Sequence, residues 1–127
     1  MAVIAFIEIN DGVIKKGSLE AASYASKLAQ EKGTKAVAVV VGNGSNVEIL
    51  GKYGISEAFH YKIEDTKINS QSVTAILKSE AENLNATDAI FSGSWIAKSV
   101  AAALAVQANM GIVTEVTELP KNGSITK

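Results

Sequence analysis

Short apolar runs alternate along this chain with segments whose apolar residues recur at helical spacing, and this alternation limits the folds that it can adopt. Residues 2–9 and 36–41 are apolar almost throughout, as in strands that are covered on both faces. The last run, residues 112–119, mixes apolar and polar residues and therefore indicates an edge strand. The five predicted strands cover residues 2–9, 36–41, 58–63, 88–91 and 112–119.

Four segments between these runs are predicted to be helices. Ser18 is a candidate N-cap of the first, and Gly33 ends it. A short helix is predicted over residues 45–53, ended by Gly54, and two longer ones have their apolar residues on one face. Strand–helix alternation with right-handed crossovers predicts an α/β fold, in which helices cover both faces of a parallel sheet. A length of 127 residues is typical of one domain.

The composition excludes several classes of chemistry. The chain has no cysteine and one histidine, His60, so disulfides, thiolate metal sites and cysteine nucleophiles are excluded. All 12 basic residues are lysine, and with 13 acidic residues the net charge is −1, which argues against a nucleic-acid surface. No apolar run reaches the roughly 20 residues that a membrane-spanning helix needs, and no basic flank precedes the apolar N-terminus as in a signal peptide. We therefore expect a soluble, intracellular domain.

The turn after the fourth predicted strand is the strongest candidate for a ligand site. Phe91-Ser92-Gly93-Ser94-Trp95 joins the end of a strand to the start of a helix, where free backbone N–H groups and the helix dipole can hold an anion. Ligands of doubly wound sheets bind at this carboxyl edge. A tight connection with Ser94 as an ordinary N-cap needs the same residue types, so both interpretations of Ser92, Gly93 and Ser94 remain open.

Two other glycine turns carry weaker signals. Gly42-Asn43-Gly44 begins like a dinucleotide fingerprint, but it lacks the third glycine and follows the second strand instead of the first. We interpret it as a flexible turn that caps the next helix. Asn10-Asp11-Gly12 places an acid where a phosphate would lie, and it is predicted to form a tight turn.

The titratable residues form no recognisable catalytic group. Glu8 ends the first strand at the ligand edge, but no base or metal ligand accompanies it, so a satisfied strand-end carboxylate is the preferred interpretation. Glu115 and Glu118 differ by three positions along a strand and therefore point to opposite faces. His60 lies within an apolar strand, which indicates a structural role. We therefore predict no catalytic residue and no metal site.

Four stretches, taken in order, carry a family resemblance. The first strand ends in an acid and leads into Asn10-Asp11-Gly12, and the first helix carries Ser18-Leu19-Glu20-Ala21-Ala22. The third unit begins Lys52-Tyr53-Gly54-Ile55-Ser56-Glu57-Ala58. The most specific stretch is Ser92-Gly93-Ser94 before an alanine-rich helix, followed by Gly111-Ile112-Val113-Thr114-Glu115-Val116-Thr117-Glu118-Leu119. With these motifs the chain resembles the N-terminal domain of the alpha subunit of electron transfer flavoproteins.

The resemblance implies both a topology and a role. The fold would be adenine-nucleotide alpha hydrolase-like, a three-layer α/β/α structure whose five-stranded parallel sheet has the order 3-2-1-4-5. The domain would be a structural and subunit-interaction domain of a heterodimer that carries electrons from flavin dehydrogenases to a quinone reductase or another acceptor. The implied location is the cytoplasm of a bacterium, or the matrix for a mature protein.

The implied partner is the electron transfer flavoprotein beta subunit, and the implied cofactor of the whole heterodimer is FAD. A C-terminal domain absent from this sequence would hold the FAD, so residues 1–119 would form the N-terminal domain and residues 120–127 the start of the connection. We expect the chain alone to bind no cofactor and to be redox-inactive.

Four residues are candidates for the subunit interface, which are Trp95, Lys98, Thr114 and Glu115. For Trp95, an interface anchor and a cover for the sheet edge both remain open. Where the family often has Gly-Arg-Asp, this chain has Ala97-Lys98-Ser99. Lys98 keeps the positive charge but loses the planar fork of arginine, so an arginine-mediated contact is not carried over.

A second class of function remains open, a small nucleotide-binding protein resembling universal stress proteins. Such a protein would use the Gly42-Asn43-Gly44 and Ser92-Gly93-Ser94 loops. Its pattern has an aspartate near the end of the first strand and a Gly-x2-Gly spacing before the last turn, where this chain has Glu8 and the lone Gly93. Hydrolysis through Glu8 is a third hypothesis, with almost no support.

Overall fold

A computed structural model describes residues 2–10, 12–44, 47–64, 67–107 and 110–114. Its strands and helices alternate as the apolar runs predict. In chain order they are β1 (Ala2–Asn10), β2 (Val13–Ile14), α1 (Lys16–Lys32), β3 (Lys35–Val41), the 3-10 helix η1 (Val47–Tyr53), β4 (Glu57–Tyr61), α2 (Ser70–Leu84), β5 (Ala86–Ile90), α3 (Trp95–Gln107) and β6 (Gly111–Val113).

The main sheet is parallel and has the order β4-β3-β1-β5-β6. Because β2 is a short addition to β1, this order is the predicted 3-2-1-4-5, and the prediction is confirmed. Strand β1 lies at the centre, with Ile4 paired to Val37 of β3 on one side and to Ala89 of β5 on the other. The continuous apolar sequence of β1 follows from this position, since both of its faces are buried.

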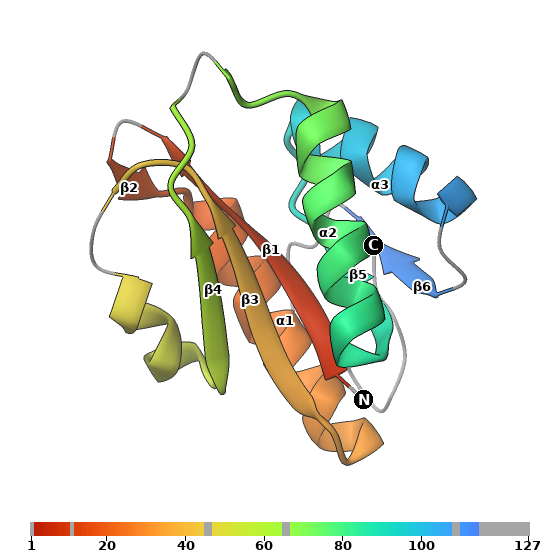
Figure 1. Ribbon diagram of the computed structural model, residues 1–127. Coiled ribbons are helices and arrows are strands. Elements are labelled where there is room, and N and C mark those ends of the chain that lie inside the picture. The colour runs from red at the N-terminus through yellow and green to blue at the C-terminus, as the bar shows by residue number, and fades with distance from the viewer. Residues whose placement is uncertain (1, 11, 45–46, 65–66, 108–109, 115–127) are drawn as a thin grey trace.

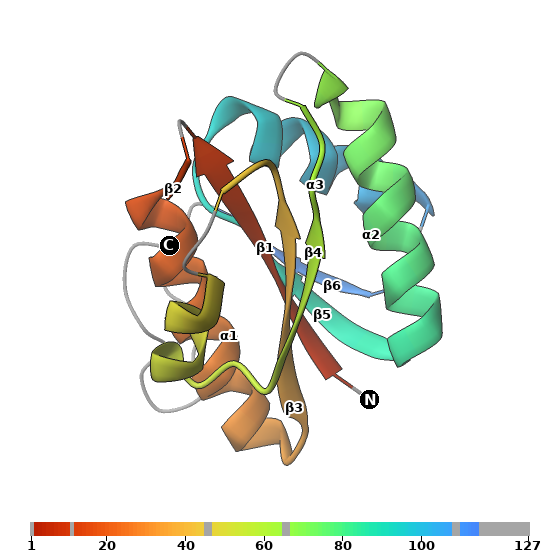
Figure 2. The ribbon, with the colours of Figure 1, turned by 60° about the vertical axis from the view of Figure 1, so that its left-hand side comes forward.

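Helices cover both faces of the sheet and produce three layers (Figures 1 and 2). Side chains alternate along β1, so Ala5 and Ile7 pack towards α1, while Ile4 and Phe6 pack towards α2 and α3. Two apolar clusters result, one on each face of the sheet. The three-layer α/β/α fold is therefore as predicted.

The predicted end of α1 is confirmed and its predicted start is wrong. Gly33 is left-handed (φ 69°) and closes the helix, with its N–H bonded to the last carbonyls. The helix begins at Lys16, with Lys15 at the N-cap position. Ser18 lies inside the first turn and is buried, and its hydroxyl oxygen accepts the backbone N–H of Glu8.

Three further differences concern the connections. The sequence did not indicate β2, which pairs antiparallel with β1 through Ile9 and Ile14 and lies where β1, β3 and β4 end (Figure 1). The short helix before Gly54 is a 3-10 helix that begins at Val47, and residues 45–46 lie outside the described part. The last predicted strand is described as Gly111–Val113, and the part of it from residue 115 onwards also lies outside.

Candidate functional site

The candidate site lies where the topology of the sheet reverses. From β1 the chain goes first to β3 and β4 on one side, and it returns later to β5 and β6 on the other side. The carboxyl ends of β1 and β5 therefore flank the switch point at which doubly wound folds bind ligands. Glu8 is near the end of β1, and Ser92 follows β5 by two residues.

Glu8 and the serine turn are in direct contact. The hydroxyls of Ser92 and Ser94 donate to Glu8 Oε2, at 3.0 and 2.7 Å. The ammonium of Lys15 is 3.9 Å from the other carboxylate oxygen, Oε1. Glu8 is only 7% exposed, and Ser92 is also buried. The hydroxyls that could bind an external anion thus bind a carboxylate of the chain itself.

Backbone contacts bring the starts of α1 and α3 to this carboxylate. The N–H of Lys15 donates to the carbonyl of Glu8 at 3.1 Å, and this bond fixes the residue before α1. A Cβ on Gly17 would be 3.2 Å from Ser92 Cβ, so the first turn of α1 lies against the serine turn. Ser94 caps α3, since its Oγ accepts the N–H of Ala97 at 3.1 Å. Two helix N-termini therefore converge on Glu8.

This convergence explains why a buried carboxylate is stable here. The first turns of α1 and α3 contain no acidic residue, although helix N-termini favour negative charge. Lys15 and Lys16 at the start of α1 add positive charge near the same point. Glu8 supplies the missing negative charge, and its hydroxyl donors offset the loss of water.

The turn Gly42-Asn43-Gly44 packs against the side chain of Ile9. A Cβ on Gly44 would be 2.8 Å from Ile9 Cγ2, and a Cβ on Gly42 would be 3.1 Å from Ile9 Cβ. Gly44 also forms a parallel bridge with Gly12 at the β1–β2 turn. The described part of this loop is thus held against the β1–β2 hairpin. Whether it caps the next helix depends on residues 45–46, which are outside the described range.

His60 helps to hold the same loop. Its Nε2 donates to the carbonyl of Gly42 at 2.7 Å, and the N–H of Gly42 donates to the carbonyl of Tyr61 at 3.0 Å. A structural role for His60, as the sequence indicated, agrees with this bond.

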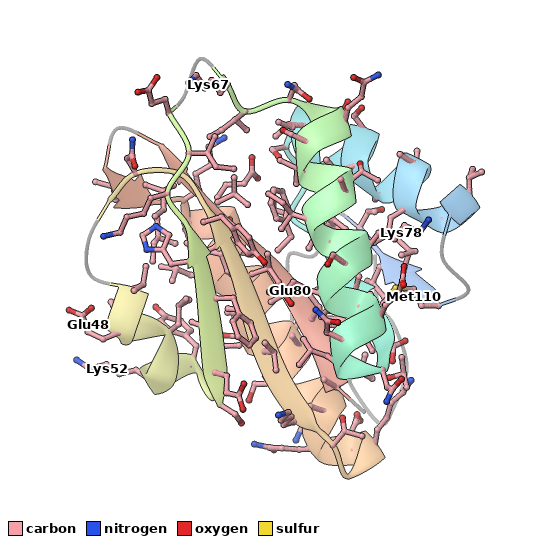
Figure 3. The ribbon with its side chains drawn as sticks, in the orientation of Figure 1. Glu48, Lys52, Lys67, Lys78, Glu80 and Met110 are labelled. Atoms are coloured by element: carbon pink, nitrogen blue, oxygen red, sulfur yellow. The ribbon has the colours of Figure 1, made fainter. Side chains whose placement is uncertain are left out.

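A hydrogen bond joins the half-buried Tyr61 of β4 to the buried Glu80 of α2. The hydroxyl of Tyr61 donates to Glu80 Oε2 at 2.7 Å, and this hydrogen bond raises the pKa of Tyr61 above its usual 10.0. Figure 3 shows Glu80 on the side of α2 that faces the sheet. Within the described ranges, no three potential metal ligands of the His, Cys, Asp or Glu type lie together. No helix among the described residues has the length and apolar character to cross a membrane.

The structure describes part of the predicted subunit interface. Lys98 is exposed on α3, and Thr114 is half-buried directly after β6. The backbone of Trp95 begins α3, but its side chain lies outside the described part, as does the whole of Glu115 together with Glu118.

Sequence reasoning singled out Glu8 and the serine turn separately and missed their contact. The strand order implied by the resemblance makes β1 and β5 neighbours, so this signal could have found the pair. Lys15 and Ser18 were missed as parts of the same cluster, because their contacts depend on how α1 leaves the β1–β2 hairpin.

Comparison with known proteins gives one family and one fold. A family model described as the electron transfer flavoprotein domain matches residues 3–126. A universal stress family protein from Burkholderia pseudomallei is structurally similar, with 16% identity, coverage of 91% of this chain and 96% of that chain, and a TM-score of 0.55. The universal stress protein from Archaeoglobus fulgidus in complex with dAMP shows 14% identity, coverage of 90% and 96%, and a TM-score of 0.53. At such identities the likeness shows a shared adenine-nucleotide alpha hydrolase fold. No curated protein matches the sequence.

Proposed function

Since the chain belongs to the family of electron transfer flavoprotein domains, we propose that it is the N-terminal structural and subunit-interaction domain of an alpha subunit. The family is one of electron carriers and not of classic enzymes. The parent heterodimer would pass electrons from flavin dehydrogenases to a quinone reductase or another acceptor. The FAD of the heterodimer would be bound by another domain. The domain formed by the present chain would support the complex.

The contact of Glu8 with the serine turn is the observation that carries this proposal. A nucleotide-binding domain of this topology needs free donors at the switch point, and here the hydroxyls of Ser92 and Ser94 are bonded to Glu8. The other candidate loop packs on Ile9. Both features support a scaffold without a nucleotide of its own.

Nucleotide binding is the second candidate function. It is favoured by the fold shared with the dAMP-bound universal stress protein from Archaeoglobus fulgidus. Calorimetric titration of the chain with ATP, ADP and AMP separates the two candidates. The scaffold function predicts no saturable heat, whereas a sub-millimolar affinity for any of the three would contradict it.

Binding to the beta subunit tests the interaction role directly. Lys98 is exposed on α3, and Lys52 is exposed on η1 at the opposite face of the sheet, where Figure 3 shows it pointing outward. Charge reversal at the interface should weaken binding, so Lys98→Glu should raise the dissociation constant at least tenfold and Lys52→Glu should leave it unchanged. Equal affinities of the two variants would remove Lys98 from the interface. No binding of the unmodified chain would refute the subunit-interaction role.

A further inference from the structure

The surroundings of Glu8 contain the donors of a phosphate site. The cluster has the hydroxyls of Ser92 and Ser94, the ammonium of Lys15 and the N-terminus of the 13-residue helix α3. The N-terminus of α1 approaches from the other side, through the contact of Gly17 with Ser92. Hydroxyls, a lysine and helix N-termini are the groups that proteins use to bind phosphate.

The bound anion is part of the chain. Glu8 Oε2 accepts both serine hydroxyls, and Oε1 faces Lys15, so the carboxylate uses the donors from both sides. A phosphate could form the same bonds only after this carboxylate had left. If both were present, two negative groups would lie within a few ångströms of each other in a buried place, where their repulsion is poorly screened.

We infer that Glu8 takes the place of a ligand phosphate, and that this one residue makes the switch point unable to bind phosphate monoesters. The inference deepens the proposed scaffold function and rests on it. Glu8 is thus a specificity-determining residue that acts by occupation and by charge. Removing its side chain uncovers an anion site made by Ser92, Ser94, Lys15 and the start of α3.

The test uses Glu8→Ala, with Glu8→Ser as a second variant that keeps a small polar side chain. Inorganic phosphate is the probe, measured by ³¹P NMR and by thermal unfolding in phosphate and in chloride at equal ionic strength. Phosphate stabilises many proteins without binding them, so each shift is compared with that of the unmodified chain. Glu80→Ala is the matched control. Glu80 is an equally buried glutamate, but it lies in the middle of α2, away from any helix N-terminus, and it accepts a hydrogen bond from Tyr61.

We expect only the two Glu8 variants to gain phosphate binding. A dissociation constant of about 1 mM would raise the folding equilibrium constant roughly 50-fold in 50 mM phosphate. The unmodified chain and Glu80→Ala should show no such gain, and adding Ser92→Ala to Glu8→Ala should reduce it. If a Glu8 variant does not fold in chloride, phosphate should restore its folding.

Three results would overturn the inference. The first is that both Glu8 variants gain no more from phosphate than the unmodified chain, or stay unfolded in it. The second is that Glu80→Ala gains as much, and the third is that Ser92→Ala does not reduce the gain. These results leave the proposed function intact. Saturable phosphate or nucleotide binding by the unmodified chain would instead contradict the proposed function as well.

Discussion

Replacing Tyr24 with phenylalanine should stabilise the protein. Tyr24 is 0% exposed, and its hydroxyl has no hydrogen-bond partner among the described residues. Burial raises the pKa of this tyrosine above 10.0, and the negative charges of Glu31 and Asp88 add to the effect. A buried polar group without a partner costs about 1–3 kcal/mol. Phenylalanine keeps the ring and removes this cost, so Tyr24→Phe should raise the free energy of unfolding by about 1 kcal/mol.

The same substitution at Tyr61 should have the opposite effect. Its hydroxyl donates to Glu80 at 2.7 Å, and Glu80 is only 7% exposed. Tyr61→Phe removes this donor from a buried carboxylate, and hydrogen bonds to charged groups are worth about 1.5–3 kcal/mol. The two variants remove the same atom from the same residue type, so their difference isolates the effect of the partner.

Urea unfolding followed by circular dichroism measures both changes, and thermal unfolding checks them. For 127 residues the unfolding entropy is about 0.27 kcal/mol/K, so 1 kcal/mol corresponds to about 4 °C in Tm. Tyr24→Phe should therefore melt about 4 °C higher and Tyr61→Phe about 6–11 °C lower. A Tyr24→Phe variant less stable than the unmodified chain, or two variants that shift in the same direction, would refute the reasoning.

Two other predictions concern alkaline pH and a helix contact. Because the folded state raises the pKa of Tyr24 and Tyr61 above 10.0, it holds their hydroxyl protons more tightly than the unfolded chain does. The free energy of unfolding is therefore unaffected by these groups below pH 10 and falls as the pH rises through the folded pKa values. Urea titrations from pH 9 to 12 should show the decline, and its absence would argue against both shifts. Gly54→Ala should cost about 2–4 kcal/mol, because Gly54 is left-handed (φ 87°) and its Cβ would lie 2.8 Å from Ser26 Cβ. Adding Ser26→Gly should restore only the packing part, and a Gly54→Ala variant as stable as the unmodified chain would contradict the clash.

The sequence predicts the architecture of this domain well because the burial of an element determines the pattern of apolar residues within that element. Strand β1 is covered on both faces, so its residues are apolar without alternation, and the pattern reports its position in the sheet. Gly33 ends α1 because the left-handed residue after a helix is usually glycine, and this requirement is also local. Such signals need no knowledge of distant residues.

The errors occur where tertiary contacts decide. Ser18 has the residue type of an N-cap, yet its hydroxyl accepts the N–H of Glu8, and α1 begins two residues earlier than Ser18. Strand β2 has two residues, too few for a period, and it depends on pairing with β1 and on the bridge between Gly12 and Gly44. Neither feature could be read from its own neighbourhood.

In the candidate site, too, some features are determined locally and others by tertiary contacts. Glu8 and Ser92 are each recognisable from their positions after strands, but they are 84 residues apart, and the bond between them depends on the strand order and on the approach of α1. The sequence therefore left two interpretations of the serine turn open. In the structure Ser94 caps α3, as the second interpretation has it, and its hydroxyl also donates to Glu8.

Glu8 and Ile9 fill the carboxyl edge of the sheet and are adjacent in β1. A substitution of one of them does not clear the space that the other occupies. Successive side chains of a strand point to opposite faces, so Glu8 reaches the start of α3 while Ile9 packs on Gly42 and Gly44. Removing Glu8 frees the serine turn and leaves Ile9 in place. Glu8→Ala should therefore bind inorganic phosphate and AMP with similar affinity, because the adenosine part gains no pocket at the glycine turn. An AMP affinity more than tenfold higher would show that the glycine turn can open without any change at Ile9.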